Sequence, residues 1–255
     1  MPFTQSGDLR IHYCLEGSGP PLLLLHGWSA SGAANFEGFG WIDALAPRYR
    51  LVLPDFRGHG RSAKPWRPNA YSFESLACDV VAVLDAAGIE SAPVFGYSTG
   101  ARVALELLIA HPARVTAAAL GGIGARFQFG WGRVFAPEDG LPRPLIDWFP
   151  PRRFPALATW LRNDPIALAA CFRALYHRQP AAPGLEELAG ITAPVLVVNG
   201  TRDGFARSAP ELAAAIPGAR LATISGRNHA SALGDRRLKA VVIDFLQAAS
   251  GSLGG

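Results

Sequence analysis

The sequence predicts an α/β fold, in which helices cover both faces of a parallel sheet and a helical segment interrupts the pattern. Strand-like and helix-like segments alternate along most of the 255 residues. The strand-like segments have no polar face, and the apolar run "PPLLLLHG" at residues 20–27 is the clearest of them. A parallel strand that is covered on both sides has this composition, whereas a half-exposed strand alternates polar and apolar residues. The alternation stops near residue 125 and resumes near residue 190, which predicts an insert within an α/β domain.

The elements before residue 125 follow one another in the order that such a domain requires. The segment at residues 9–17 has the period-two alternation of a strand. The helix expected at residues 72–88 has apolar side chains at helical spacing from Leu76 to Leu84, and Gly88 is a typical stop signal. Taken in order, strands are expected at 9–17, 20–27, 48–56, 92–98 and 115–124, and helices at 72–88 and 99–112.

The chain after residue 125 divides into an insert and a return to the α/β pattern. The insert is rich in Pro, Arg and aromatic residues and contains two helical patterns, at residues 154–162 and 164–178. After it, strands are expected at 193–203 and 219–229, and helices at 208–218 and 236–250. We therefore predict a core domain of residues 1–124 and 191–255 and a helical cap of residues 125–190.

Composition excludes several other classes of protein. Hydrophobic residues make up 49% of the chain and charged residues 17%, as in globular proteins, and no apolar run approaches the roughly 20 residues of a membrane-spanning helix. The net charge of +4 arises from scattered arginines without a binding-module signature, so neither a nucleic-acid partner nor a membrane partner is expected. Cys14, Cys78 and Cys171 are far apart and the N-terminus is polar, which favours a cytoplasmic location and argues against a metal site.

A serine between two glycines lies where an expected strand gives way to a helix. The sequence there is Gly96-Tyr97-Ser98-Thr99-Gly100. A Gly-x-Ser-x-Gly turn in this context holds the serine in a strained conformation, so its neighbours must be small and its hydroxyl projects near the helix N-terminus. The alternative is a helix-capping serine beside ordinary glycines. We favour a nucleophilic serine because the chain also supplies the partners that it needs.

A serine hydroxyl becomes nucleophilic when a histidine takes its proton and an acid orients the histidine. Among the six histidines, His229 is placed best, because it follows the last expected strand in a loop that can cross the carboxyl edge of the sheet. Asp203 ends the preceding strand just where the chain turns. We therefore predict that Ser98 is the nucleophile, Asp203 the acid and His229 the base, in that chain order.

Acyl transfer through a serine also needs hydrogen-bond donors for the oxyanion, the negatively charged oxygen of its intermediate. One expected donor is the backbone N–H of Thr99, which follows the nucleophile directly. The second is the backbone N–H of Trp28, in the turn after the strand at residues 20–27, which His26 and Gly27 shape. These two N–H groups are the predicted oxyanion hole.

Together these motifs resemble the α/β-hydrolase superfamily over nearly the whole chain. "LLLLHGWSAS" is similar to the family's strand and oxyanion-hole turn, and "VLPDFRGHGRS" to its Asp-x-x-Gly-His-Gly-x-Ser loop, here with Asp55, His59 and Ser62. "GYSTG", "NGTRD" and "GRNH" are similar to the nucleophile, acid and base segments. The resemblance implies the α/β-hydrolase fold, with an eight-stranded, mostly parallel sheet and a small helical cap between strands six and seven. It also implies that no metal or organic cofactor is needed.

The resemblance implies a hydrolase, and the serine narrows the reaction. Relatives that open epoxides or dehalogenate alkanes carry aspartate at this position, so we expect a serine hydrolase that cleaves small-to-medium apolar carboxylic esters through an acyl-enzyme. Arg102 favours an alternative, a C–C hydrolase or lyase with a carboxylate-bearing substrate, because short-cap lyases of menaquinone synthesis have a similar "GYS-x-G-x-R" stretch. A buried ion pair is the other interpretation of Arg102. A ligand receptor without catalytic activity is the alternative of another class.

Aromatic residues are concentrated in the predicted cap. Ten of the 25 Phe, Trp and Tyr residues lie between residues 125 and 184. They favour an apolar pocket that excludes water, although the core of the cap would use the same residues. The predicted pocket residues are His26, Tyr97, Arg102, Phe127, Phe129, Trp131 and Trp148. The expected partner is a small-molecule ester, and a homodimer is left open.

Overall fold

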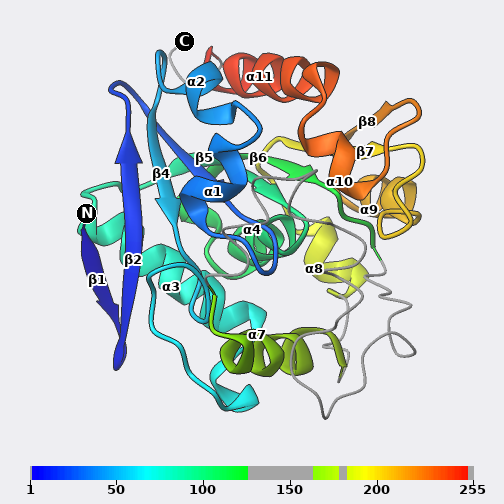
Figure 1. Ribbon diagram of the computed structural model, residues 1–255. Helices are drawn as coiled ribbons and strands as arrows, with labels where there is room; N and C mark the ends of the chain where they lie inside the picture. The colour runs from blue at the N-terminus through cyan, green and yellow to red at the C-terminus, as the bar shows by residue number, and fades with distance from the viewer. Residues whose placement is uncertain (1, 126–162, 178–182, 252–255) are drawn as a thin grey trace.

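The computed structural model describes residues 2–125, 163–177 and 183–251, and their strands form one eight-stranded sheet (Figure 1). The strand order is β1-β2-β4-β3-β5-β6-β7-β8. β2 pairs antiparallel with β1 and with β4, whereas all other neighbours pair in parallel. The predicted mostly parallel sheet is therefore confirmed, with an antiparallel edge formed by the first two strands.

The strands match the expected segments with one addition. In chain order they are β1 (Phe3–Ser6), β2 (Leu9–Glu16), β3 (Pro21–Leu25), β4 (Arg50–Pro54), β5 (Ala92–Tyr97), β6 (Val115–Gly121), β7 (Val195–Gly200) and β8 (Arg220–Ile224). β1 was not predicted, because its four residues mix polar and apolar side chains. Pairing with β2 holds these residues in the extended conformation of a strand. The strand expected at residues 219–229 ends earlier, since the chain turns after Ile224 and starts a helix at His229.

The helices cover both faces of the sheet. Those of the core are α1 (Gly32–Glu37), α2 (Trp41–Leu45), α3 (Phe73–Ala86), α4 (Thr99–Ala110), α9 (Ala209–Ala215), α10 (His229–Leu233) and α11 (Arg236–Gly251), with the short 3-10 turns η1 (Pro68–Ala70) and η2 (Pro112–Arg114). In Figure 1, α2 and α11 lie above the sheet and α3 and α4 below it. The helices predicted for the core are confirmed, and the short helices α1, α2 and α10 were not predicted.

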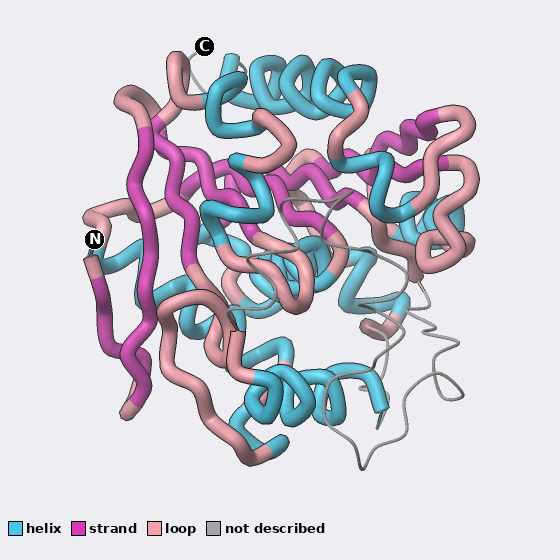
Figure 2. Tube along the Cα trace, viewed as in Figure 1, coloured by secondary structure: helices cyan, strands magenta, loops and turns pink. Residues whose placement is uncertain are grey.

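The sheet separates two apolar layers, because successive side chains of a strand point to opposite faces. In β3, Leu23 and Leu25 join the cluster that contains residues of α3 and α4. Leu22 and Leu24 join the cluster that contains residues of α2 and α11. Helices lie on both sides of the central strands in Figure 2. Both faces of β3 are therefore buried, which explains why the strand has no polar residue.

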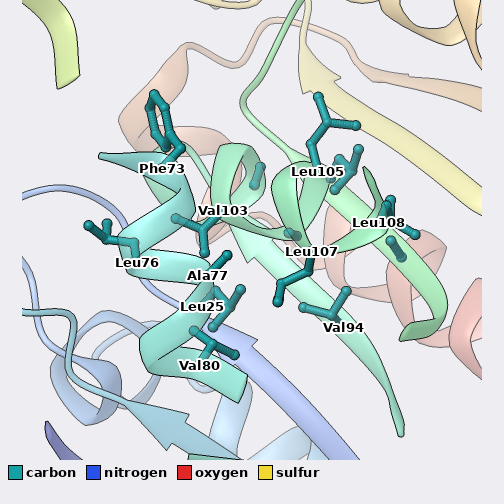
Figure 3. Close-up of a cluster of buried hydrophobic side chains, with 14 of the residues drawn as sticks. Leu25, Phe73, Leu76, Ala77, Val80, Val94, Val103, Leu105, Leu107 and Leu108 are labelled. Atoms are coloured by element: carbon teal, nitrogen blue, oxygen red, sulfur yellow. The ribbon is translucent and has the colours of Figure 1, made fainter. Parts of the chain in front are cut away.

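The lower layer fixes the helix that follows Ser98. Leu76 and Val80 of α3 pack in one cluster with Val103 and Leu107 of α4 (Figure 3). All of these side chains are fully buried, and burial of each contributes about 2 kcal/mol relative to exposure. α4 is thereby held against α3 and the lower face of the sheet.

The segment between β6 and β7 is the predicted place of the cap. Its described part contains α7 (Pro165–Phe172), the π-helical turn η4 (Arg173–His177) and α8 (Leu185–Ala189). α7 and η4 confirm the helix expected at residues 164–178, and the helix expected at residues 154–162 lies outside the described residues. The domain boundaries at residues 125 and 190 stay a prediction.

Candidate active site

Ser98 connects β5 to α4 in a backbone conformation that few residues adopt. Its φ is 56° and its ψ is −116°. A positive φ at a residue with a Cβ costs about 1–3 kcal/mol and persists only where the surrounding structure holds it. This conformation is the one that a nucleophile elbow requires, because it projects the side chain beyond the carboxyl end of the strand.

The glycines on either side of Ser98 are needed for close packing. A Cβ atom on Gly100 would lie 2.0 Å from the carbonyl oxygen of Leu25. A Cβ atom on Gly96 would lie 2.3 Å from the carbonyl oxygen of Gly100. No side chain tolerates such distances, so α4 approaches β3 and β5 this closely only with glycine at both positions. The Gly-x-Ser-x-Gly pattern therefore has a packing reason.

The structure brings Ser98, Asp203 and His229 together. His229 Nε2 lies 3.0 Å from Ser98 Oγ, and His229 Nδ1 lies 2.8 Å from Asp203 Oδ2. The Asp203 side chain is fully buried, whereas the His229 side chain is 23% exposed. An ionised carboxylate can only accept hydrogen bonds, so Nδ1 carries the proton and Nε2 faces the serine hydroxyl as an acceptor. This arrangement can take a proton from Ser98.

The segments that carry Asp203 and His229 are fixed by local hydrogen bonds. Asp203 follows β7 in a turn in which its N–H donates to the carbonyl oxygen of Gly200, and its Oδ1 accepts the N–H of Phe205 at 3.0 Å. His229 is the first residue of α10, and the side chain of Asn228 caps that helix by accepting the N–H of Ser231 at 2.9 Å. Each group is therefore held by backbone contacts before a substrate binds.

Tyr97 is buried and contacts His229. Its side chain is almost completely buried, and its hydroxyl donates a 2.6 Å hydrogen bond to the carbonyl oxygen of His229. Its ring also contacts the imidazole, with 5.4 Å between ring centroids. Burial raises the pKa of the Tyr97 hydroxyl, so it stays a donor at working pH. These contacts favour a role for Tyr97 in positioning His229, and its assignment to the pocket stays a prediction.

Two residues that the sequence analysis missed also surround the imidazole. The ring of Phe205 meets the ring of His229 edge-on, with 4.8 Å between centroids. Gly122 has a φ of 67°, and a Cβ atom there would lie 2.9 Å from His229 Cε1. Phe205 was signalled only by its place two residues after Asp203, and Gly122 by the "GG" that ends a strand-like segment.

The predicted oxyanion donors lie next to the nucleophile, but the Trp28 N–H is not open. Thr99 is the first residue of α4, where N–H groups have no acceptor within the helix. The N–H of Trp28 donates to the side-chain hydroxyl of Thr99, with 3.1 Å between nitrogen and oxygen. The Trp28 N–H thus has an acceptor in Thr99, and its role as an oxyanion donor stays a prediction.

His26 holds the turn before Trp28 and is not a pocket residue. Its side chain is fully buried. Nδ1 lies 2.7 Å from the carbonyl oxygen of Gly27, and Nε2 accepts the N–H of Phe56 at 3.0 Å. Burial lowers the pKa of His26, which keeps the ring neutral and Nε2 able to accept. The pocket assignment for His26 is therefore corrected: the ring connects two loops.

Arg102 is engaged within the protein. Its guanidinium forms a 3.0 Å ion pair with Glu106 one turn later on α4, and it lies 4.6 Å from the centroid of the Phe73 ring. The side chain is about nine-tenths buried. This is the buried ion pair of the other interpretation of Arg102, and it leaves the substrate-carboxylate role without structural support. The remaining predicted pocket residues, Phe127, Phe129, Trp131 and Trp148, lie outside the described residues.

The Asp-x-x-Gly-His-Gly-x-Ser loop is joined by hydrogen bonds to the turn around Trp28. Asp55 accepts the N–H groups of Gly32 and Arg61 at 2.7 and 2.8 Å. Asn163, just before α7, accepts the N–H of Gly60 and donates to the carbonyl oxygen of Ser29, both at 2.7 Å. The loop, the turn after Trp28 and the described start of the inserted helices are thus joined by hydrogen bonds.

His59 makes the stability of the fold depend on pH. It is fully buried, and burial, with a smaller contribution from His26, lowers its pKa to about 3. The unfolded chain binds this proton near pH 6.5, so stability is complete above pH 6.5 and falls as the pH drops toward 3. Asp55 and Lys64 are the other charged groups that act on the ring.

Replacing His59 should therefore flatten the pH dependence of unfolding. Between pH 7 and pH 5 we expect the free energy of unfolding of His59→Gln to fall by about 2 kcal/mol less than that of the unaltered chain. Urea titrations at both pH values measure this difference. His111→Gln, at the more exposed end of α4, is the matched control and should keep the full slope. Equal slopes for the two variants would contradict the assignment.

Comparisons with known proteins agree with this geometry. A family model described as the alpha/beta hydrolase fold matches residues 20–163. RutD of Azorhizobium caulinodans, to which carbamate hydrolysis is ascribed, is 32% identical over 251 residues, covering 90% of this chain and 92% of RutD. A 2-hydroxymuconate semialdehyde hydrolase of Pseudomonas putida is 31% identical over 195 residues, covering 74% of this chain and 64% of that protein.

Solved structures are similar along almost the whole chain. The enol-lactonase of Burkholderia xenovorans LB400 superimposes with a TM-score of 0.81 at 25% identity, and the match covers 96% of this chain and all of the lactonase chain.

None of the helices in the described ranges combines the length and the hydropathy that crossing a membrane requires.

Proposed function

Since this chain belongs to the family of the alpha/beta hydrolase fold, we propose that it is a serine hydrolase that cleaves small-to-medium apolar carboxylic esters. The observation that carries the proposal is the hydrogen-bonded series from Asp203 through His229 to Ser98. These residues are distant along the chain, yet a carboxylate oxygen of Asp203 faces Nδ1 of His229, and Nε2 of His229 faces the hydroxyl of Ser98. Proton transfer from Ser98 to His229 needs this arrangement.

In the acylation step, Ser98 Oγ attacks the carbonyl carbon of the ester while His229 Nε2 takes the hydroxyl proton. The π electron pair moves to the carbonyl oxygen, which becomes the oxyanion. The backbone N–H of Thr99 donates to this oxygen. Asp203 stays ionised and balances the positive charge of the imidazolium through Nδ1–H.

Collapse of the tetrahedral intermediate completes the cycle. The C–O bond to the alcohol breaks, the alcohol takes the proton from Nε2, and an acyl group remains on Ser98. Water then attacks the acyl carbon while Nε2 accepts its proton, and the carboxylic acid leaves as the proton returns to Ser98 Oγ. No redox or metal chemistry enters any step.

The surroundings of the site favour an apolar substrate. The ring of Trp28 meets the ring of Phe172 edge-on at 5.3 Å, and Phe172 lies 5.3 Å from Tyr176. Together with Phe205 beside the imidazole, these rings can bury an aryl or alkyl group near Ser98. We also propose that residues 125–190 form the cap. The enol-lactonase acts on a cyclic ester, in keeping with the proposed bond type.

A C–C hydrolase is the second candidate, and one relative favours it. The Pseudomonas putida protein hydrolyses a semialdehyde, and its match covers about three quarters of this chain. The sequence feature that first suggested this reaction is weaker, because Arg102 is occupied by Glu106. We therefore place the ester first.

A panel of substrates tests the choice. The protein would be incubated with a fluorophosphonate probe and assayed with p-nitrophenyl butyrate, an aryl lactone and a 2-hydroxy-6-oxo-diene acid. We expect labelling of Ser98 and turnover of the ester and the lactone. Turnover of the dienoic acid alone would favour the C–C hydrolase. Tight binding of a small molecule without labelling or turnover would favour a ligand receptor.

A further inference from the structure

The hydroxyl of Thr99 lies beside the nucleophile. Thr99 follows Ser98 directly, and its Oγ1 accepts the N–H of Trp28 at 3.1 Å. The turn that carries Trp28 reaches the nucleophile itself, since a Cβ atom on Gly27 would lie 3.6 Å from Ser98 Cβ. The Thr99 side chain is fully buried. Its hydroxyl therefore lies inside the protein, between the turn that carries Trp28 and Ser98, next to the predicted oxyanion hole.

The same hydroxyl has a second partner from the inserted segment. Thr99 Oγ1 and the hydroxyl of Tyr176 in η4 are within hydrogen-bond distance. Phe172 and Phe73 lie 5.3 and 6.2 Å from the Tyr176 ring, measured between centroids, and so limit its movement. Its surroundings raise the pKa of the Tyr176 phenol, mainly through loss of water, so that it keeps its proton.

The direction of these hydrogen bonds follows from the chemistry of the groups. An N–H can only donate, so the Trp28 N–H uses one lone pair of Thr99 Oγ1. A phenol is more acidic than an aliphatic alcohol and is the better donor of the pair, so Tyr176 uses the other lone pair. Thr99 then has its own proton left to give. An oxyanion is a stronger hydrogen-bond acceptor than a phenol oxygen. Its formation therefore favours the arrangement in which Tyr176 donates to Thr99 and Thr99 donates to the oxyanion.

We propose that the side-chain hydroxyl of Thr99 is itself a donor to the oxyanion, with the Trp28 N–H and the Tyr176 hydroxyl holding it in place. This inference rests on the proposed serine-hydrolase function. It adds a donor to the predicted oxyanion hole, and the contact of the Trp28 N–H with Thr99 Oγ1 places the hydroxyl beside that hole. Two donors into one hydroxyl polarise its O–H bond and make it a stronger donor.

Tyr176 is then a positioning residue that acts through Thr99. It belongs to the segment between β6 and β7, whereas Thr99 and Trp28 belong to the core. The inserted segment thereby acts on the transition state and not only on substrate binding. A group that only shapes a pocket changes KM, whereas an oxyanion donor changes kcat.

Thr99→Val removes the hydroxyl and keeps the branched shape of the side chain. We expect kcat for p-nitrophenyl butyrate to fall about 100-fold, the loss typical of one oxyanion donor, with KM within about threefold. Thr99→Ser keeps the hydroxyl and should stay within about threefold of the unaltered enzyme. Tyr176→Phe keeps the ring and should lower kcat about tenfold. Thr223→Val, on the exposed face of β8, is the control for loss of a threonine hydroxyl.

An aryl boronic acid, which forms a tetrahedral adduct with a serine, gives an independent measurement. Its affinity should fall in Thr99→Val by about the same factor as kcat/KM, while thermal unfolding reports that the variant is folded. A Thr99→Val enzyme with kcat and boronate affinity within threefold of the unaltered enzyme overturns this inference alone. An unaltered enzyme that neither turns over esters nor reacts with the fluorophosphonate overturns the proposed function as well.

Discussion

Ser98→Ala is expected to lower kcat for p-nitrophenyl butyrate by about 10⁴-fold or more, because the variant has no atom that can form the acyl-enzyme. His229 and Asp203 keep their hydrogen bond in this variant, so any remaining rate reflects water attack and binding alone. Steady-state kinetics measures the loss, and intact-protein mass spectrometry after fluorophosphonate treatment should show no adduct.

Two controls distinguish the loss of the nucleophile from a loss of the fold or of any exposed serine. Alanine removes only Oγ from a residue whose strained backbone is held by the close packing of Gly96 and Gly100, so the thermal unfolding midpoint should change by a few degrees at most. Ser225→Ala, at an exposed serine after β8, should retain full activity and labelling. Ester turnover that survives in Ser98→Ala would remove Ser98 from the mechanism.

The positions of the three proposed catalytic residues could be predicted because each has a local signal. Ser98 lies between glycines at a strand-to-helix junction, and Asp203 and His229 follow the last two expected strands. Carboxyl ends of parallel strands share one edge, so side chains that follow such strands meet there. The alternation of strands and helices therefore predicts both the fold and the position of the site.

The supporting residues could not be predicted, since their contacts join distant parts of the chain. Tyr97 is separated by 132 residues from His229, whose carbonyl oxygen it binds, and an aromatic residue beside a nucleophile fits a pocket equally well. Thr99 is 77 residues from Tyr176. Nothing in the "GYSTG" motif distinguishes a threonine whose hydroxyl is used from one that only fills space.

The short elements were missed for a different reason. β1, α1 and α2 contain four to six residues each, which is too few for a period of 2 or 3.6 to be recognised. Their order comes from tertiary contacts: β1 pairs with β2, and Trp41 of α2 donates its indole N–H to the carbonyl oxygen of Leu233 at 2.9 Å. These partners lie in other parts of the chain, so the local sequence does not predict them.

Asp203→Asn should lower kcat by about 10⁴-fold, the size of the effect when a triad histidine is held in the wrong tautomer. In the unaltered chain, Asp203 Oδ1 accepts the N–H of Phe205 and Oδ2 accepts Nδ1–H of His229. In the asparagine variant, the carbonyl oxygen must keep the Phe205 N–H, so the NH₂ group faces His229 and donates to Nδ1. The imidazole proton then moves to Nε2.

That tautomer presents N–H to Ser98 Oγ and cannot take the serine proton, although all three side chains stay in place. We therefore expect kcat to fall while KM and the thermal unfolding midpoint stay nearly constant, and fluorophosphonate labelling of Ser98 to slow in parallel. Asp85→Asn is the matched control, because Asp85 is 63% exposed and pairs only with Arg114 among the described contacts. If Asp203→Asn kept a tenth of the activity, His229 would need no acidic partner, and Asp203 would be an ordinary turn former after β7.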